Sequence, residues 1–483
     1  MKSNERVYLK TVLVTGSFNV LHPGHLRLLR FAKDCGDHLI VAVQSDRLAG
    51  NAAHVNQNLR LESMQSIAWV DEAFIFDEQL DSLIIRLRPD VVVKGKEHEL
   101  RFNPELAVLD RIGGKLSFSS GETIFSSLDL IRKEFQVLNF ESINLPNEYL
   151  KRHQIEPARL IDLLQKFSGL RLCVVGDLII DEYITCETLG LSQEDPTIVV
   201  TPIDSTRFVG GAGIVASHAA GLGASVKFVS VAGKDESRDY ALAGLTAAGV
   251  VAHLLVDDSR PTTLKQRYRS KGKSLLRVSH LHQGAISVGL QTQLLDVLGK
   301  ALESADLLVF SDFNYGCLPQ QLVDQLIAIA KGRGVLLAAD SQSSSQVGDI
   351  SRFKEMDLIT PTEREARIST RNREDGLVVL AEQLRQQASA RNVLLKLGEE
   401  GILIHAADES GKSWLTDRVD ALNSSPKDVA GAGDSLLITS AMALACGGTI
   451  WEAACLGSLA AAVQVGRLGN TPLRTEEFLR ELR

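Results

Sequence analysis

The chain of 483 residues lacks any apolar run of about 18 residues, the length that a membrane-spanning helix requires. Its first residues, MKSNERVYLKTVLV, have no apolar stretch followed by small residues, so they do not predict a signal peptide. Basic residues are fewer than acidic residues: the chain has 52 Lys and Arg and 60 Asp and Glu. Nucleic-acid-binding proteins usually carry a basic patch. We therefore expect a cytoplasmic protein whose partners are neither nucleic acid nor membrane.

Cysteine is also scarce, and its six positions are scattered without a CxxC pair. They are Cys35, Cys173, Cys186, Cys317, Cys446 and Cys455. A disulfide framework or a zinc knuckle would need paired spacings, so neither is expected. The pattern is typical of buried or idle thiols in a reducing compartment.

What the chain does contain is alternation of strand and helix patterns, in two stretches. In residues 1–140, TVLVTG and HLIVAVQ predict strands, and GHLRLLRFAKDCG between them predicts a helix. Residues 141–168 contain prolines and mixed charge and predict a linker, after which residues 169–483 resume the alternation. This pattern predicts two α/β domains, each with a parallel sheet and ligands at the carboxyl ends of its strands.

One stretch of the second domain differs, because TTLKQRYRSKGKSLLRVS alternates with a period of two. It predicts a β-hairpin over residues 263–279 that turns at Ser270–Lys273. Its Lys and Arg residues also suit a simple edge strand protected against pairing with other chains.

The segment VTGSFNVLHPGHLRLL, from Val14 to Leu29, places two histidines where a strand leads into a helix. A helix N-terminus attracts phosphate, and Gly16 and Gly24 allow the backbone to approach it closely. His22 and His25 can donate hydrogen bonds to a phosphoryl group as its charge builds. From the residues alone, two surface histidines beside a capped helix remain an alternative. A zinc pair is a further alternative, although no third ligand is evident.

In its context this segment resembles the nucleotidylyltransferase family, which includes cytidylyltransferases and sugar-phosphate adenylyltransferases, over roughly residues 8–135. The resemblance implies a Rossmann-like domain in which a sugar phosphate attacks the α-phosphate of ATP or CTP and pyrophosphate leaves. It implies catalytic roles for Lys10, His22 and His25. It implies nucleotide or phosphate contacts for Gly16, Phe18, Gly24, Arg60, Lys94, Ser126 and Ser127. Magnesium would neutralise the triphosphate. Asn19 stands where the family more often has aspartate.

A second glycine-rich turn, DVAGAGDSLL, begins at Asp428. The N–H groups of Gly431, Ala432 and Gly433 can cradle a phosphoryl group. Asp434 could accept a hydroxyl proton as a phosphate ester forms. The alternative is an acidic residue that only stabilises the helix dipole.

This turn, with VVGDLIIDEY, FVGGAGIVASHAAGLGA and LKLGEEGI, resembles the ribokinase-like (pfkB) sugar kinases over about residues 170–475. The closing segment resembles the heptose 7-phosphate kinase branch. The resemblance implies that Asp434 is the catalytic base and that the predicted hairpin belongs to a small β lid. It implies sugar contacts from Asp181, Gly210, Gly211 and an inward-pointing Arg277. It implies nucleotide contacts from Lys396, Gly398 and Gly401, magnesium near Glu365, and a monovalent cation.

Both halves together resemble the bifunctional enzymes of ADP-heptose synthesis, with the domain order reversed. Four residues depart from the heptose kinase pattern: Ile214 and Thr362 replace Asn, Tyr315 replaces Lys, and Ser279 replaces an acid. Three hypotheses follow. The protein makes an activated heptose, or it performs the same two reactions on another sugar or alditol phosphate. Alternatively, it is an active transferase whose kinase-like half is a binding or dimerisation module. We also expect a homodimer.

Overall fold

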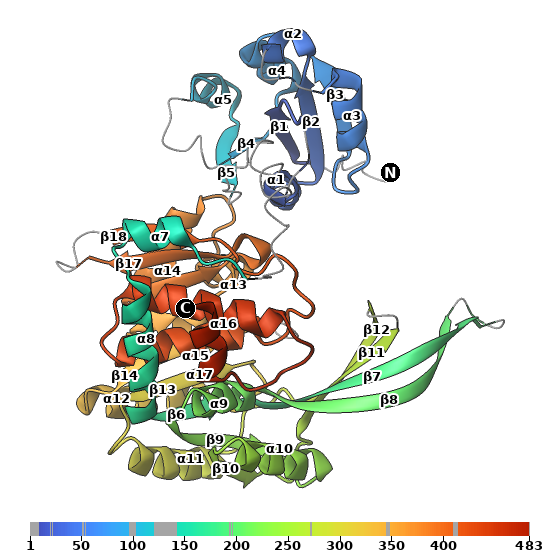
Figure 1. Ribbon diagram of the computed structural model, residues 1–483. Helices are drawn as coiled ribbons and strands as arrows, with labels where there is room; N and C mark the ends of the chain where they lie inside the picture. Colours follow the sequence, from blue (N-terminus) through green and yellow to red (C-terminus); the bar gives the residue numbers. More distant parts are fainter. Residues whose placement is uncertain are drawn as a thin grey trace, which may run out of the picture. The chain divides into compact units, whose positions relative to one another are not determined.

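The computed structural model (Figure 1) describes residues 9–19, 21, 23–50, 53, 55–95, 103–119, 143–192, 195, 197–270, 273–343, 348–408 and 414–482. The chain divides into two compact units. The first comprises residues 1–140 with 371–380, and the second residues 141–370 with 381–483. No helix within the described residues combines the length and apolar character that crossing a bilayer requires.

The first unit is a parallel α/β sheet in the strand order β3-β2-β1-β4-β5. Its strands are β1 (Thr11–Gly16), β2 (His38–Gln44), β3 (Glu72–Phe76), β4 (Val91–Gly95) and β5 (Lys115–Ser119). Its helices are α1 (Pro23–Asp34), α2 (Asp46–Ala49), α3 (Gln57–Gln65), α4 (Leu80–Leu87) and α5 (Leu106–Ile112).

Side chains of β1 alternate between two apolar layers, one on each face of this sheet. Val12 and Val14 pack in the layer that contains Leu29 of α1. Leu13 packs in the opposite layer with Leu83 of α4. A strand covered on both faces must be apolar throughout, which is why TVLV reads as a continuous run. The predicted Rossmann-like arrangement is confirmed.

The second unit is built on a larger sheet, in the order β10-β9-β6-β13-β14-β15-β16-β17-β18. These strands are β6 (Arg171–Gly176), β9 (Ser225–Ala232), β10 (Val251–Val256), β13 (Leu307–Asp312), β14 (Leu336–Ser341), β15 (Leu358–Ile359), β16 (Asn392–Lys396), β17 (Ile402–Ala407) and β18 (Trp414–Val419). Neighbours pair in parallel except for β16 with β17 and β17 with β18.

Helices pack against this sheet and bury its apolar side chains. They are α7 (Asn147–Arg152), α8 (Pro157–Lys166), α9 (Ala212–Gly221), α10 (Glu236–Ala247), α11 (Val288–Ala301), α12 (Gln320–Gly332), α13 (Glu363–Thr370), α15 (Ala432–Ala445), α16 (Ile450–Val465) and α17 (Thr475–Glu481). The helix α14 (Leu377–Ala388) begins in the segment assigned to the first unit and continues into the second unit. Short 3-10 helices are η3 (Phe167–Gly169), η4 (Ile350–Arg352) and η5 (Gly398–Glu400). α15 and α16 are buried over most of their length, which explains their apolar, small-residue sequences.

A separate small sheet, in the order β12-β11-β7-β8, forms the lid of this unit. β7 (Leu178–Leu191) and β8 (Ile198–Gly211) leave the body as two long curved strands, with β11 (Thr263–Ser270) and β12 (Lys273–His280) beside them (Figure 1). The predicted hairpin is confirmed as β11 and β12, which pair antiparallel. The sequence did not identify β7 and β8 as strands of the lid. The segment VVGDLIIDEY, which contains the end of β6 and the start of β7, is apolar enough to resemble a buried strand of the main sheet.

The predicted linker at residues 141–168 is wrong, because most of this segment is part of the second unit. Tyr149, Leu160 and Leu163 lie in its main apolar core. The Tyr149 hydroxyl donates to the carbonyl of Trp451 at 2.8 Å. The prolines on which the linker prediction rested, Pro146 and Pro157, lie at the starts of α7 and α8. Proline is well tolerated at a helix start, because the N–H group that it lacks would have no partner in the helix.

Candidate kinase and nucleotidyl-transfer sites

The glycine turn of the second unit leads directly into α15. Gly431 has φ +77°, a left-handed conformation that favours glycine. A Cβ at Gly431 would meet Oδ1 of Asn470 at 2.5 Å, so the turn has no room for a side chain there. Asp434 follows in the first helical turn and is only 6% exposed. Its Oδ1 accepts a hydrogen bond from Nε2 of Gln342 at 3.1 Å.

Burial raises the pKa of Asp434 from its ordinary value to about 7. The negative charges of Asp340 and Asp181 act in the same direction, while Lys396 and Lys265 oppose them. A carboxylate with a pKa near neutrality is well matched to take a proton from a hydroxyl group. The base predicted from the sequence therefore lies in an environment suited to that chemistry.

Lys396, at the end of β16, forms a buried ion pair with Asp340 of β14. Its Nζ lies 3.0 and 2.9 Å from the two carboxylate oxygens. A Cβ at Gly433 would be 3.2 Å from the same Nζ, so the ammonium lies against the glycine turn. The structure thus places Lys396 at the turn, and not only beside Gly398 and Gly401 as the sequence suggested. These two glycines have φ +64° and +88°; Gly398 is the first residue of the short helix η5, and Gly401 follows its last residue.

Asp181 of β7 is the acidic group on the lid side of the site and is 6% exposed. Nδ2 of Asn470 donates to its Oδ2 at 3.2 Å, and Nη2 of Arg267 lies 3.5 Å from its Oδ1. Burial raises the pKa of Asp181, and the charges of Arg267 and Lys265 oppose that rise. A Cβ at Gly210 would collide with the Asp181 carboxylate, which explains the glycine at that position.

The strand register places cationic side chains of the lid on the same face as Asp181. Lys265 is aligned with Asp181 across β11 and β7, and Arg267 faces Arg277 across β11 and β12. Arg277, predicted to point inward, therefore shares this face but is exposed, and it is Arg267 that contacts Asp181. The period-two pattern of KQRYR already put Lys265 and Arg267 on one face, so this signal could have identified them. Gln342 and Asn470 carried no such signal.

Tyr315 is almost fully buried, at 2% exposure, and stacks beside Phe313. The Lys265 ammonium lies 5.0 Å from the Phe313 ring centroid and 5.1 Å from that of Tyr315. The Lys265 ammonium of the lid therefore lies over the ring of Tyr315, the residue that stands where the heptose kinases have lysine. Ser279 is exposed and faces Lys265 across the hairpin, and Ile214 is buried in the first turn of α9.

Glu365, predicted to lie near magnesium, has both carboxylate oxygens engaged. They accept the N–H groups of Ser343 at 2.8 Å and Thr362 at 2.7 Å. The N–H of Glu365 in turn donates to the Thr362 hydroxyl at 3.3 Å, which closes a reciprocal cap at the start of α13. Among the described parts of the chain, no three His, Cys, Asp or Glu side chains are grouped for metal binding.

In the first unit, β1 ends at Gly16 and the chain turns toward α1. Phe18 has φ +48° and is 3% exposed. Its ring meets that of His25 edge-on, with centroids 5.3 Å apart. Gly24 is buried in the first turn of α1. His25 and both glycines thus lie around one turn, as the sequence predicted.

Three predicted residues of this site, His22, Ser126 and Ser127, lie outside the described residues. Lys10 precedes β1, and its backbone N–H donates to Asp37 at 2.9 Å.

Two predicted phosphate ligands of the first unit have protein partners in the structure. The Lys94 ammonium donates to Oδ1 of Asn103 at 2.9 Å and pairs with the buried carboxylate of Glu105. Arg60 is completely buried and donates to protein oxygens only. Arg60 is therefore enclosed by the protein, whereas the paired Lys94 side chain is still 20% exposed. The sequence could not reveal either environment.

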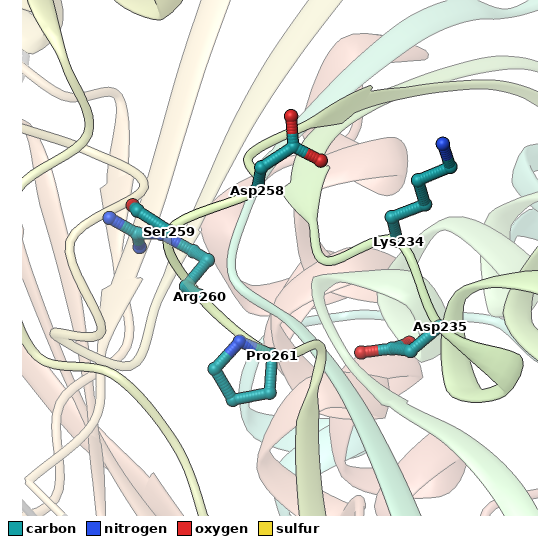
Figure 2. A pocket seen from close by; sticks show the side chains of 6 residues that line it. All are labelled: Lys234, Asp235, Asp258, Ser259, Arg260 and Pro261. Atoms are coloured by element: carbon teal, nitrogen blue, oxygen red, sulfur yellow. The ribbon is translucent and has the colours of Figure 1, made fainter.

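A hollow of about 550 Å³ lies where β9 and β10 end (Figure 2). Its lining comprises Lys234, Asp235, Asp258, Ser259, Arg260 and Pro261. Arg260 donates from there to the carbonyls of Tyr315 and Gly284 at 3.0 and 2.8 Å. Two cations and two anions face this hollow, so its charges do not favour an ionic ligand of either sign.

A sheet of this topology, a β lid and a buried aspartate behind a glycine turn define a carbohydrate kinase of the α/β class. The comparison of sequences is more specific: residues 170–476 match the model of the pfkB family carbohydrate kinases. The chain belongs to that family. Residues 13–123 match the cytidylyltransferase-like model, so a nucleotidylyltransferase-like domain precedes the kinase domain.

Curated relatives carry the name bifunctional protein HldE. The one from Desulfatibacillum aliphaticivorans is 31% identical over 320 residues, which cover 65% of this chain and 64% of the relative. The one from Nitrobacter hamburgensis is 32% identical over 328 residues, covering 66% and 65%. The chain therefore spans slightly less than two thirds of the length of these relatives.

Solved structures resemble the second unit. Arabidopsis thaliana ribokinase complexed with ribose and ATP has a TM-score of 0.51 at 19% identity, covering 65% of this chain and 99% of that one. Phosphofructokinase-2 from Escherichia coli with substrates and products has a TM-score of 0.52 at 16% identity, covering 65% and 98%. Likeness at these identities shows the ribokinase-like fold and confirms that part of the prediction.

Proposed function

We propose that this protein is a bifunctional transferase that phosphorylates a sugar phosphate and joins a sugar 1-phosphate to a nucleotide, producing an activated, ADP-linked heptose. The observation that carries the proposal is Asp434, buried at the start of α15 behind the glycine turn, with a pKa of about 7. A buried carboxyl group with a pKa near 7 lowers the stability of the folded protein. Its presence beside an anion-binding turn therefore favours a catalytic role for this domain over a role in binding alone.

In the kinase reaction a sugar hydroxyl oxygen attacks the γ-phosphorus of ATP, its proton passes to Asp434, and ADP leaves. The N–H groups of Gly431 to Gly433 would stabilise the charge on the transferring group. Asp181, held by Asn470 and Arg267, would accept hydrogen bonds from sugar hydroxyls. The lid would exclude water, which otherwise competes for the phosphoryl group.

In the second reaction a phosphate oxygen of the sugar 1-phosphate attacks the α-phosphorus of the nucleoside triphosphate, and pyrophosphate leaves. No protein nucleophile takes part, so the domain acts by positioning and by stabilising charge. His25, at the start of α1, would donate a hydrogen bond to the reacting phosphate, and we keep His22 and Lys10 as its proposed partners. ATP and CTP both remain candidates for this step.

Magnesium would neutralise the triphosphates in both reactions, held mainly by nucleotide oxygens and water. The engaged carboxylate of Glu365 fits an indirect role, through a water, better than direct coordination. A monovalent cation in the kinase half and a homodimeric assembly are further parts of this proposal.

A second candidate is the same pair of reactions on another sugar or alditol phosphate. Ile214 cannot replace the hydrogen bonds of an Asn, and the buried Tyr315 replaces a family lysine. A pocket that loses such groups discriminates strongly against the original substrate. The third candidate, a kinase-like half that only binds or dimerises, predicts no ADP formation at all.

A product survey tests the three candidates. The full chain is incubated with ATP or CTP and a library of sugar phosphates that includes heptose 7-phosphate and heptose 1-phosphate. Mass spectrometry then identifies phosphorylated and nucleotide-linked products. Asp434→Asn and His25→Ala serve as matched controls. We expect Asp434→Asn to abolish the phosphorylated products and spare the nucleotide-linked ones, and His25→Ala to do the reverse. Absence of phosphorylated products for every sugar phosphate would leave only the third candidate.

A further inference from the structure

Arg60 is the largest fully buried side chain among the described residues, with 0% exposure. Each of its three guanidinium nitrogens donates to a different segment. Nε donates to the carbonyl of Val55 at 2.8 Å, Nη2 to Oδ1 of Asp46 at 2.6 Å, and Nη1 to the carbonyl of Ser17. Arg60 therefore ties together the loop after β1, the start of α2 and the loop before α3.

The Ser17 carbonyl is the important acceptor, because the next residue has an unfavourable conformation. Phe18 has φ +48°, a region that bulky residues rarely occupy unless their surroundings impose it. A second bond secures the same loop, since Oδ1 of Asn19 accepts the N–H of Val55 at 3.4 Å. The loop is thus fixed at residues on both sides of Phe18.

The Phe18 ring transmits this constraint to His25. A Cβ added at Gly16 would lie 3.1 Å from the Phe18 ring, so the ring covers the end of β1. The same ring meets the imidazole of His25 at an interplanar angle of 63°. An aromatic ring locked in this way limits the orientations available to the imidazole beside it.

We propose that Arg60 is a positioning residue for nucleotidyl transfer: from beneath the loop it holds Phe18 in its left-handed conformation and, through that ring, orients His25. The inference rests on the proposed transferase function of the first domain. It assigns Arg60 a geometric role in place of the phosphate contact that the family resemblance implied. A guanidinium is suited to this role because its planar fork presents N–H donors in fixed directions from three separate nitrogens, whereas an ammonium donates from a single nitrogen.

The test compares Arg60→Lys with Arg47→Lys in the full chain. Arg47, on the neighbouring helix α2, pairs with Asp77 at 2.9 Å and is 70% exposed, so it is a matched arginine outside the loop. Pyrophosphate release gives kcat and KM for the nucleotide. Misplacement of a reacting group costs about 10²-fold in rate, so we expect Arg60→Lys to lower kcat by about that factor and to leave KM within about threefold. Arg47→Lys should change neither.

Two further measurements separate this role from a purely structural one. The thermal transition of the first unit reports whether the variant remains folded, and kinase turnover at Asp434 is the control for the second unit. The imidazole signals of His25 in a ¹H–¹⁵N spectrum should shift in Arg60→Lys and stay in place in Arg47→Lys. An Arg60→Lys protein with raised KM, normal kcat and an unchanged His25 signal would instead make Arg60 a phosphate ligand and overturn the proposal.

Phe18→Leu completes the test, because it removes the ring and keeps an apolar side chain. If Arg60 acts through Phe18, the double variant Phe18→Leu/Arg60→Lys should be no slower than the slower single variant. Losses that multiply would overturn the proposed route through Phe18. If the wild type transfers no nucleotide, the proposed function fails, while the His25 signal still decides whether Arg60 orients that imidazole.

Discussion

The kinase rate should depend on pH in a way that the surroundings of Asp434 determine. With a pKa of about 7, only about a tenth of the carboxyl groups are ionised at pH 6, and about nine tenths at pH 8. Because the reaction needs the ionised base, kcat/KM, which reports the pKa of the free enzyme, should rise about tenfold between these two pH values. An exposed aspartate would give its rise near pH 4 instead.

Two substitutions in one ion pair should move this rise in opposite directions. Lys396 lowers the pKa of Asp434 and Asp340 raises it. Lys396→Met should therefore shift the rise to higher pH, and Asp340→Asn should shift it to lower pH. A shift of the rise by one pH unit would lower the rate at pH 6 about ninefold in the first variant, or raise it about fivefold in the second. Other charged groups that act on Asp434, Asp181 and Lys265, are unchanged in both variants.

The assay is ADP release at sugar-phosphate concentrations well below KM from pH 5 to pH 9, which gives kcat/KM, with the thermal transition recorded at each pH. Lys166→Met is the control, because Lys166 pairs with Asp162 at the surface, at 2.8 Å and about half exposed. It should leave the profile unchanged. A wild-type profile that is nearly flat over this range, as a base with a pKa near 4 would give, would refute the assignment of Asp434 as a buried base governed by this pair. Shifts of the same sign in both ion-pair variants would refute it as well.

Four further predictions concern single sites and the domain boundary. Asp434→Asn should lower kinase turnover by about 10²–10⁴-fold and spare nucleotidyl transfer. Folding raises the pKa of Asp434 from 3.8 to about 7, so the protonated carboxyl stabilises the folded state at low pH, and this stabilisation is lost as the pH rises through 7. The free energy of unfolding of Asp434→Asn, measured with denaturant at pH 8, should therefore exceed that of the wild type by up to about 4 kcal/mol. His25→Ala should slow pyrophosphate release by about 10²–10³-fold with little change in nucleotide affinity, and equal loss of kinase activity would contradict separate sites. Ile214→Asn should raise kcat/KM for heptose 7-phosphate if the pocket has diverged from that substrate, and an efficient wild type with an unimproved variant would count against it. A fragment of residues 141–483 should retain kinase activity, whereas 170–483 should aggregate because it loses the buried helices α7 and α8; equal solubility would show that these helices are dispensable.

Local patterns in the sequence determined much of the architecture. TVLV and HLIVAV are continuously apolar because their strands are covered on both faces, so they could be recognised without knowing their neighbours. The positive φ of Gly431 and the place of Asp434 in the first turn of α15 are likewise properties of a few consecutive residues. The predicted hairpin followed from a period of two, which only a half-exposed strand sustains.

Only the tertiary structure decided which distant residues meet. Lys396 lies 56 positions after Asp340, and Arg60 lies 43 positions after Ser17, so no spacing rule relates them. The segment at residues 141–168 shows the same limit, since its prolines fit either a linker or two helix starts. A polar side chain in a sequence has many possible partners, and burial selects among them by requiring each charge to be neutralised and each donor to be satisfied. That selection depends on how all the surfaces pack together, and it gives Arg60, which the sequence predicted as a phosphate ligand, a buried place where it donates to the Ser17 carbonyl.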